Sequence, residues 1–336
     1  MRAAILILIL AMTLPAAAAD DDNAPTATDD QPAASAQLPG TPAQRPAPPR
    51  RADRKRRGSV VGYIADATVE NQVRVRFDAG FHSNRPDRSE FFYAQCGCNG
   101  GSAPGPKGLA TDLNFQQLTI DGQYAVHSRL ALLATLPVRF IQPQTFFNPA
   151  VAGSFGNQSG LGDVRVGVKA AVVSADDTVV SAQVQGSFQS GDAGKGLGTD
   201  HASVETALLF YQKLSDRVAI ESHLSDWHPI GGSTFQSSSY AGDVLSYGIG
   251  PSFELVRTSR LTFAPVIELV GWHAFGGLQV QPPPAVVPAD ANIVNLKFGA
   301  RTTIDGRNSF YFGYGRALTD AVWYSDIVRF EYRFSF

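Results

Sequence analysis

Apolar and polar side chains alternate strictly along the C-terminal segment of the chain. The apolar positions are Val328, Phe330, Tyr332, Phe334 and Phe336. The positions between them hold Arg329, Glu331, Arg333 and Ser335. Successive side chains of a β-strand point to opposite faces, so this pattern predicts a strand with one aromatic and one charged face.

Twelve segments alternate in this way, and their lengths suit tilted strands that cross a bilayer. They cover residues 72–83, 113–125, 129–141, 161–173, 178–189, 202–213, 217–229, 243–256, 260–274, 292–304, 308–317 and 322–336. A soluble sheet with one covered face also alternates. The repetition of the pattern, with few helical segments to cover so many apolar faces, favours a membrane protein.

The connections between these segments alternate in length. Short turns are expected at 127–128, 174–177, 215–216, 257–259 and 305–307, and long loops rich in Gly, Pro, Ser or Asn at 84–112, 142–160, 190–201, 230–242 and 275–291. Transmembrane barrels have short periplasmic turns and long external loops. Hydrocarbon offers no hydrogen-bond partner to an open strand edge, so the sheet has to close. We therefore predict an all-β, antiparallel up-and-down transmembrane β-barrel of about 12 strands over residues 70–336, with both termini periplasmic.

The N-terminal part of the chain has a different composition. Arg2, the apolar run 3–14 and the small residues before position 20 predict a secretory signal peptide over residues 1–19. Residues 20–69 are rich in Pro and Ala and predict a disordered periplasmic arm. The basic cluster from Arg50 to Arg57 suits either a solvated spacer or a contact with anionic lipid, lipopolysaccharide or cell wall.

Composition and charge narrow the class of function. Charged residues make up 17% of the chain and the formal net charge is −2, which argues against a nucleic-acid partner. Cys96 and Cys98 have no further thiol or imidazole nearby, so we expect no metal there, and an oxidising compartment favours a local or intermolecular disulfide. The sequence gives no reason to expect a cofactor.

Several short motifs resemble those of one protein family. Gly160-Leu161-Gly162-Asp163 leads into an alternating segment, and the blocks 86–93 (PDRSEFFY) and 322–326 (VWYSD) accompany it. These motifs resemble bacterial outer-membrane proteins grouped with the meta-pathway phenol-degradation transporters. The resemblance covers about 70–336 and implies an outer-membrane barrel that passes small, often hydrophobic molecules, with no catalytic residues to transfer.

The residues at the polar positions of the alternating segments are candidates for lining the lumen of a channel. They are Arg74, Arg76, Asp78, His82, Arg165, Lys169, Glu221, His223, Glu268, Lys297, Arg301, Arg329, Glu331 and Arg333. Basic side chains outnumber acidic ones, which favours small anions or polar solutes. Alternatively, charges such as Arg329, Glu331 and Arg333 pair with their neighbours and stiffen the wall. Loops 84–112 and 275–291 are candidate gates.

Other aromatic residues suggest contacts with the membrane and with the assembly machinery. Trp227, Trp272 and Trp323 fall at the external rim of the expected strands and predict an interfacial aromatic girdle. Tyr332, Phe334 and Phe336 resemble the C-terminal signal by which outer-membrane barrels are recognised for assembly. The expected partners are outer-membrane lipid and lipopolysaccharide, the barrel assembly machinery and a small solute.

Two other classes of function stay open. A lipid or ester hydrolase would need a Ser–His pair oriented by a carboxylate. Residues of these three types occur at alternate positions, and so on one face of a strand, in two segments. They are His201, Ser203 and Glu205 in one segment, and Glu221, His223 and Ser225 in the other. A structural or adhesion barrel would use its loops to bind partners. We expect a passive channel for small solutes rather than an enzyme.

Overall fold

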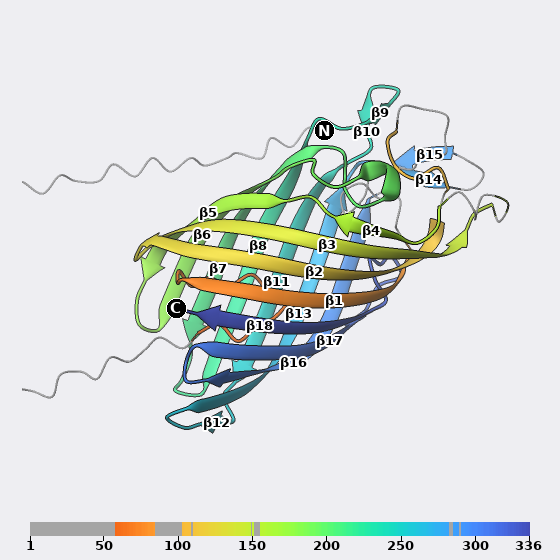
Figure 1. Cartoon of the computed structure of the whole chain (residues 1–336). Helices are drawn as coiled ribbons and strands as arrows, with labels where there is room; N and C mark the ends of the chain where they lie inside the picture. The colour runs from red at the N-terminus through yellow and green to blue at the C-terminus, as the bar shows by residue number, and fades with distance from the viewer. Residues whose placement is uncertain are drawn as a thin grey trace, which may run out of the picture. The chain divides into compact units, whose positions relative to one another are not determined.

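The computed structural model describes residues 58–84, 103–108, 110–148, 150, 155–281, 285–288 and 290–336. The expected signal peptide, residues 20–57 of the expected arm, and both cysteines lie outside these residues. Within the described part of the chain, twelve long antiparallel strands form a closed barrel (Figure 1). The predicted fold class is therefore confirmed.

Each barrel strand pairs with its neighbours in sequence. The strands are β1 (Gln72–Ser83), β2 (Ala110–His127), β3 (Leu130–Phe146), β5 (Arg165–Ser174), β6 (Thr178–Ser187), β7 (Ala202–Lys213), β8 (Val218–Ile230), β11 (Asp243–Phe253), β13 (Leu261–Phe275), β16 (Ala291–Ile304), β17 (Asn308–Ala317) and β18 (Asp326–Ser335). The first and last strands complete the ring, with Gln72 opposite Ser335. The last strand begins at Asp326, so 322–325 of the expected strand form part of a loop.

Short elements extend the wall or decorate the loops. They are β4 (Gln158–Leu161), which pairs with β3; β12 (Val256–Arg257), which pairs with β13; the hairpins β9 (Thr234–Phe235) with β10 (Ser238–Ser239) and β14 (Leu278–Gln281) with β15 (Ala285–Pro288); and the 3₁₀ turn η3 (Ala193–Lys195). No helix in the described residues is long and apolar enough to cross a membrane.

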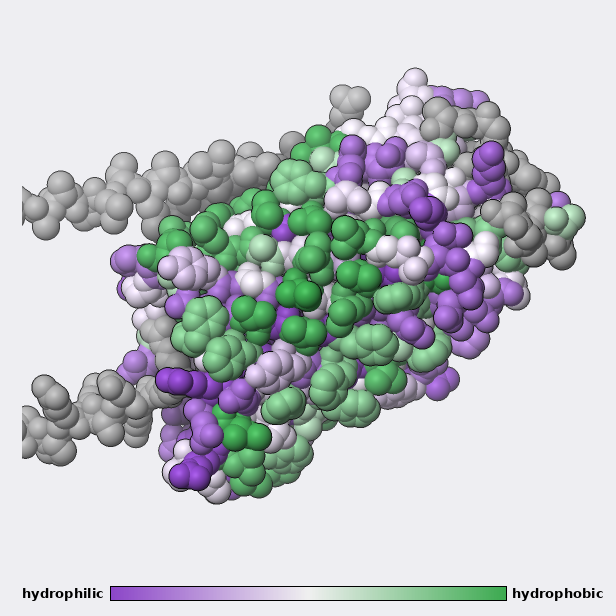
Figure 2. All heavy atoms as spheres, in the orientation of Figure 1, coloured by the Kyte–Doolittle hydropathy of each residue, from purple (hydrophilic) through white to green (hydrophobic). Residues whose placement is uncertain are grey.

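The two faces of the wall differ as the alternation predicts. Phe330 is 50% exposed on the outer face, whereas its neighbour Glu331 is fully buried inside the barrel. Figure 2 shows apolar side chains gathered in a band over the strands, with polar residues toward the end that carries the loops. Apolar side chains on the outer face and polar side chains on the inner face are the arrangement of a transmembrane barrel.

The barrel has two distinct ends. We call the end with the short connections after β2, β5, β7 and β16 the turn end, and the opposite end, which carries hairpins β9–β10 and β14–β15, the loop end (Figure 1). The backbone N–H of Phe336 donates to the Asn71 carbonyl at 3.1 Å, so β1 begins and β18 finishes at the turn end.

Residues 58–71, here called the lumen segment, enter the barrel instead of remaining outside it. The chain bends at residues 62–64 and returns to the turn end, where β1 begins. Val60, Val61 and Ile64 pack inside the barrel against Val266, Val270 and other wall residues. The disorder expected for the arm therefore does not extend to residues 58–69, because these apolar side chains and their backbone find partners in the lumen.

Glycines on the wall and on the lumen segment make room for one large side chain. Tyr311 on β17 points inward and is fully buried. A Cβ at Gly62, Gly299 or Gly313 would lie 2.2–2.5 Å from the nearest atom of the Tyr311 side chain. Since real Cβ atoms do not approach so closely, these three glycines together form the niche that Tyr311 fills.

Replacing Gly299, one of the three glycines of this niche, by a larger residue should destabilise the barrel. We expect Gly299→Val to lower the free energy of unfolding by about 1–3 kcal/mol, because the added methyl groups overpack against the Tyr311 ring. Urea unfolding of the refolded protein in detergent measures the change. Gly122→Val is the matched control, since a Cβ at Gly122 meets no heavy atom within 4 Å. Equal stability of the two variants would contradict the niche.

Candidate functional site in the barrel lumen

The bend of the lumen segment surrounds one wall carboxylate. Glu268 on β13 accepts hydrogen bonds from three consecutive backbone N–H groups, those of Gly62 (3.0 Å), Tyr63 (2.8 Å) and Ile64 (2.9 Å). The Tyr311 hydroxyl donates to the same carboxylate at 3.0 Å. Hydrogen bonds to a charged acceptor are about twice as strong as neutral ones, so Glu268 fixes the position of the bend.

A second carboxylate and three guanidinium groups hold the entering limb of the segment. Glu221 on β8 accepts from the Val60 N–H at 2.8 Å. Arg301 donates to the carbonyls of Val60 (3.0 Å) and Val61 (2.9 Å). Two further carbonyls accept from arginines of β18, that of Gly62 from Arg329 and that of Ser59 from Arg333. Carboxylates thus meet N–H groups, and guanidinium groups meet carbonyls.

The returning limb binds the opposite wall. Lys169 on β5 donates to the Asp66 carbonyl at 2.6 Å and to the Gln123 side chain at 2.8 Å. Ser181 donates to the Ala67 carbonyl at 2.6 Å. Burial disfavours ionisation of the Asp66 carboxyl, but Lys169 and Arg333 outweigh burial and hold its pKa below the ordinary value. The segment therefore spans the lumen near the turn end.

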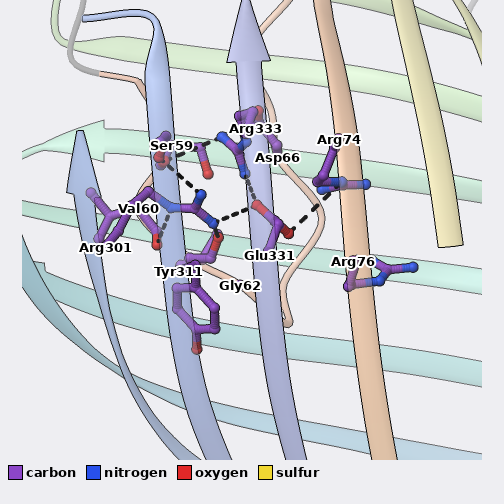
Figure 3. Close-up of polar contacts among 12 residues, drawn as sticks. Ser59, Val60, Gly62, Asp66, Arg74, Arg76, Arg301, Tyr311, Glu331 and Arg333 are labelled. Atoms are coloured by element: carbon purple, nitrogen blue, oxygen red, sulfur yellow. Dashed lines mark hydrogen bonds and ion pairs between the residues drawn. The ribbon is translucent and has the colours of Figure 1, made fainter. Parts of the chain in front are cut away.

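Charges of the wall also pair with one another (Figure 3). Glu331 contacts Arg301 at 2.8 Å, Arg333 at 3.1 Å and Arg74 at 3.8 Å. Arg74 in turn contacts Asp121 at 3.1 Å. Such pairing agrees with the second sequence interpretation, in which Glu331 and Arg333 stiffen the wall.

One further buried pair joins the first and last strands. The guanidinium of Arg329 contacts both carboxylate oxygens of Asp78, at 2.6 and 2.9 Å, and the two residues lie directly opposite each other in the β1–β18 register. The guanidinium also lies 4.1 Å from the centre of the Tyr63 ring. The pair thus links closure of the barrel to docking of the lumen segment.

The half of the lumen toward the loop end holds a cavity of about 340 Å³. Its lining is mainly polar and comprises Tyr63, Arg76, Asp78, Phe115, Gln117, Arg139, Asp163, Arg165, Ser187, Thr199, Ser203, Glu205, Ser225, Trp227, Val244, Ser246, Trp272, Lys297, Trp323, Tyr324, Ile327 and Arg329. Of the lumen segment, Tyr63 alone belongs to this lining. The Lys297 ammonium lies 3.9 Å from the centre of the Tyr63 ring and donates to the Tyr324 hydroxyl at 2.8 Å.

The three tryptophans do not form an aromatic girdle on the outer face. Trp227 and Trp272 have the inward parity of their strands, and Trp323 lies in the loop before β18, only 5% exposed. The Trp272 and Trp323 rings pack at 5.4 Å, and Trp227 packs on His201 at 5.5 Å. The girdle prediction is wrong because it was based on the position of these residues near the external end of the strands. It did not consider which face of the wall they lie on.

Most of the other predicted lumen residues face the interior, but His82 does not join them. The register of β1 shifts between Gly80 and Ser83, and His82 adopts φ 57°. Its exposed side chain pairs with Asp112 at 2.9 Å near the loop end. Arg165 lies in the cavity wall, 3.9 Å from Glu205, and His223 contacts Ser246 at 3.1 Å. The bulge, which alternation does not reveal, places His82 outside.

The candidate catalytic set on β8, Glu221, His223 and Ser225, does not assemble as a triad. Glu221 binds the Val60 N–H of the lumen segment, and the buried Nδ1 atom of His223 has no hydrogen-bond partner among the described residues. A carboxylate is therefore not orienting this imidazole, as a general base would require. In the other candidate set, the His201 Nδ1 contacts the Ala202 carbonyl at 3.1 Å.

The structure gives the Gly-Leu-Gly-Asp motif a role that sequence reasoning did not assign. Gly160 and Leu161 end β4, Gly162 and Asp163 lie between β4 and β5, and the Asp163 side chain turns toward the loop that follows β6. The carboxylate accepts from the Gly191 N–H at 3.0 Å and from both the N–H and the hydroxyl of Thr199 at 2.8 Å. Asp163 therefore holds the loop 188–201 against the cavity.

Comparisons with known proteins bear on the fold. No protein-family model matches the chain, and no curated protein matches it. The crystal structure of an outer membrane channel from Pseudomonas putida F1 is similar, with a TM-score of 0.51 over 82% of this chain and 98% of the channel at 17% identity. The β domain of the Bordetella autotransporter BrkA gives 0.46 over 80% and 100% of the two chains at 13% identity. The NanC porin gives 0.43 over 79% and 98% at 10% identity.

At 17% identity the likeness to the P. putida channel describes the fold alone. The fold class that the closed barrel and its likeness to the P. putida channel define is the outer-membrane type of β-barrel. The recognition made from the sequence is confirmed at the level of the fold, since the resemblance implied an outer-membrane type of barrel and the chain has that fold. The assembly signal at Tyr332, Phe334 and Phe336 stays a prediction; Phe334 and Phe336 are exposed and stack at 6.1 Å.

Loss of the Asp163 carboxylate should release the loop 188–201. We expect Asp163→Ala to speed tryptic cleavage after Lys195 by about tenfold or more, because three hydrogen bonds to a charged acceptor are lost. Timed proteolysis of the folded barrel, followed by mass spectrometry, measures the rate. Asp177→Ala, in an exposed turn at the opposite end, should leave cleavage at Lys195 unchanged. An unaltered rate in Asp163→Ala would remove the proposed role of the motif.

Proposed function

We propose that the protein is a passive outer-membrane channel for small polar solutes, with the turn end toward the periplasm. The observation that carries this proposal is the polar cavity at the loop end. It is lined by inward-facing side chains of many barrel strands and reaches down to Tyr63. A polar interior is typical of barrels that conduct water and solutes, so the polar lining of this cavity supports a channel.

The charges of the cavity favour anions. Five basic side chains line it, namely Arg76, Arg139, Arg165, Lys297 and Arg329, against the three acidic side chains Asp78, Asp163 and Glu205. Asp78 is neutralised by Arg329, and Asp163 is hydrogen-bonded to the loop 188–201. The surplus positive charge faces the space through which a solute would enter, and a field of this sign raises the local concentration of small anions.

Aromatic side chains add a second feature to the cavity. Trp272, Trp323 and Tyr324 pack together beside the Lys297 ammonium. Such a surface suits small organic anions, whose carbon skeleton contacts the rings while the charged group stays near the basic side chains. Selection would then rest on size and charge and not on a chemical reaction.

Neutralising an accessible basic residue should weaken the preference for anions. We expect Arg165→Gln to lower the anion-to-cation permeability ratio about twofold, since a unit charge acting through water at about 8 Å contributes about 0.5 kcal/mol. Reversal potentials in planar bilayers under a salt gradient measure the ratio.

The control is Arg260→Gln, which changes an exposed residue in the turn between β12 and β13, outside the cavity lining. Its permeability ratio should equal that of the wild type. A cation-selective wild type, or one with no selectivity, would contradict the anion preference. Liposome swelling with sugars, amino acids and aromatic acids then ranks the solutes, and hydrolysis of phospholipid by the same preparation would instead support an enzyme.

A further inference from the structure

The lumen segment is attached to the wall without being part of it. None of residues 58–71 belongs to a β-ladder in the described structure, and the segment connects to the barrel wall through the start of β1. Its hydrogen bonds with Glu221, Glu268 and Arg301 join backbone atoms of the segment to side chains of the wall. Release of the segment would therefore break no strand pairing, and the barrel would stay closed.

The wall also retains internal partners when the segment leaves. Arg301 keeps Glu331 at 2.8 Å and Ser309 at 3.1 Å. Arg329 keeps both oxygens of Asp78. Glu268 keeps the Tyr311 hydroxyl and lies opposite Lys297 in the β13–β16 register. Charged side chains with such partners tolerate water in place of the segment, whereas an apolar core would not.

Docking of the segment also closes the floor of the cavity. Tyr63, at the bend, lies between the cavity and the turn end and packs edge-on against Tyr311 at 6.1 Å. Its ring covers the cationic groups of Lys297 and Arg329. On the turn-end side of Tyr63, Val60, Val61 and Ile64 fill the lumen with apolar side chains. Tyr63 and these apolar side chains therefore narrow the lumen where the bend is docked.

We propose that the lumen segment is a displaceable plug, and that its release from Glu221 and Glu268 joins the loop-end cavity to the turn end and opens the channel. This inference rests on the proposed channel function and adds the means by which the same lumen is closed. The two carboxylates act as latches, because they bind the backbone N–H groups of Val60, Gly62, Tyr63 and Ile64.

The position of the plug can be measured without any reference to conduction. Ser59 is 2% exposed in the docked state, and Ser59→Cys is nearly isosteric. In a background with Cys96→Ser and Cys98→Ser, this single thiol should react slowly with a membrane-impermeant maleimide. Adding Glu221→Gln and Glu268→Gln should raise the labelling rate about tenfold or more, since several charge-assisted hydrogen bonds become neutral ones.

The matched control replaces a lumen carboxylate that does not hold the segment. Glu205 faces the cavity and pairs with Arg165, so Glu205→Gln should leave the labelling rate of Ser59→Cys unchanged. Heat-modifiable migration on gels confirms that each variant is a folded barrel. Rapid labelling in the parent protein, or equal rates with and without the latch substitutions, would overturn the plug.

Conduction is then measured on the same proteins in planar bilayers. We expect the parent to be closed for most of the time and the double Glu→Gln variant to have an open probability about tenfold higher. A second variant that lacks residues 58–70 should conduct continuously, which covers the case in which the substitutions disturb folding. If labelling increases but neither variant conducts, the plug moves and the proposed channel function fails. If the deletion conducts no more than the parent while both are folded and conducting, the channel stands and the plug is wrong.

Discussion

Closure of the hydrogen-bond ladder between β1 and β18 is the constraint on which the rest of this structure depends. Lipid accepts no hydrogen bonds from the backbone, so a spanning sheet survives only as a ring. Once the ring is closed, every second side chain points into a confined lumen. Arg329 and Asp78 show the result, because they lie opposite each other at the seam and neutralise one another there. Polar groups that are crowded together in this way need partners, and the lumen segment supplies many of them.

Acidic side chains in this interior each bind several partners. Glu331 is shared by three arginines of β1, β16 and β18, which leaves donors on Arg301 and Arg333 for the carbonyls of the lumen segment. Glu268 accepts from three successive N–H groups of the bend, much as a ring of backbone amides surrounds a bound anion. Glu331 and Glu268 are thereby stabilised although they are buried, because a buried charge is costly unless it is paired or hydrogen-bonded.

The sequence alone predicted the barrel and most inward positions, because a period of two is a direct consequence of strand geometry. Residues such as Glu221, Glu268 and Arg301 followed from parity alone. Their partners did not, since the depth at which the lumen segment meets the wall depends on the bend at residues 62–64. The segment itself follows a stretch dominated by Pro, Ala and Arg, and its own apolar residues show no period that would mark a strand. The prediction placed His82 in the lumen because alternation does not reveal the bulge in β1. It placed the tryptophans in an outer girdle because it considered their height along the barrel and not the face on which they lie.

Main-chain recognition has a consequence for how this region can change over time. The wall binds the N–H and carbonyl groups of the lumen segment, which every non-proline residue offers equally. Substitutions at positions such as Ser59 or Ala65 thus leave those bonds available, whereas Gly62 is restricted by the Tyr311 ring. Sequences of related barrels could therefore diverge widely before β1 and still be sealed in the same manner, and the trace of such a seal would be found in the acidic and basic residues of the opposing strands.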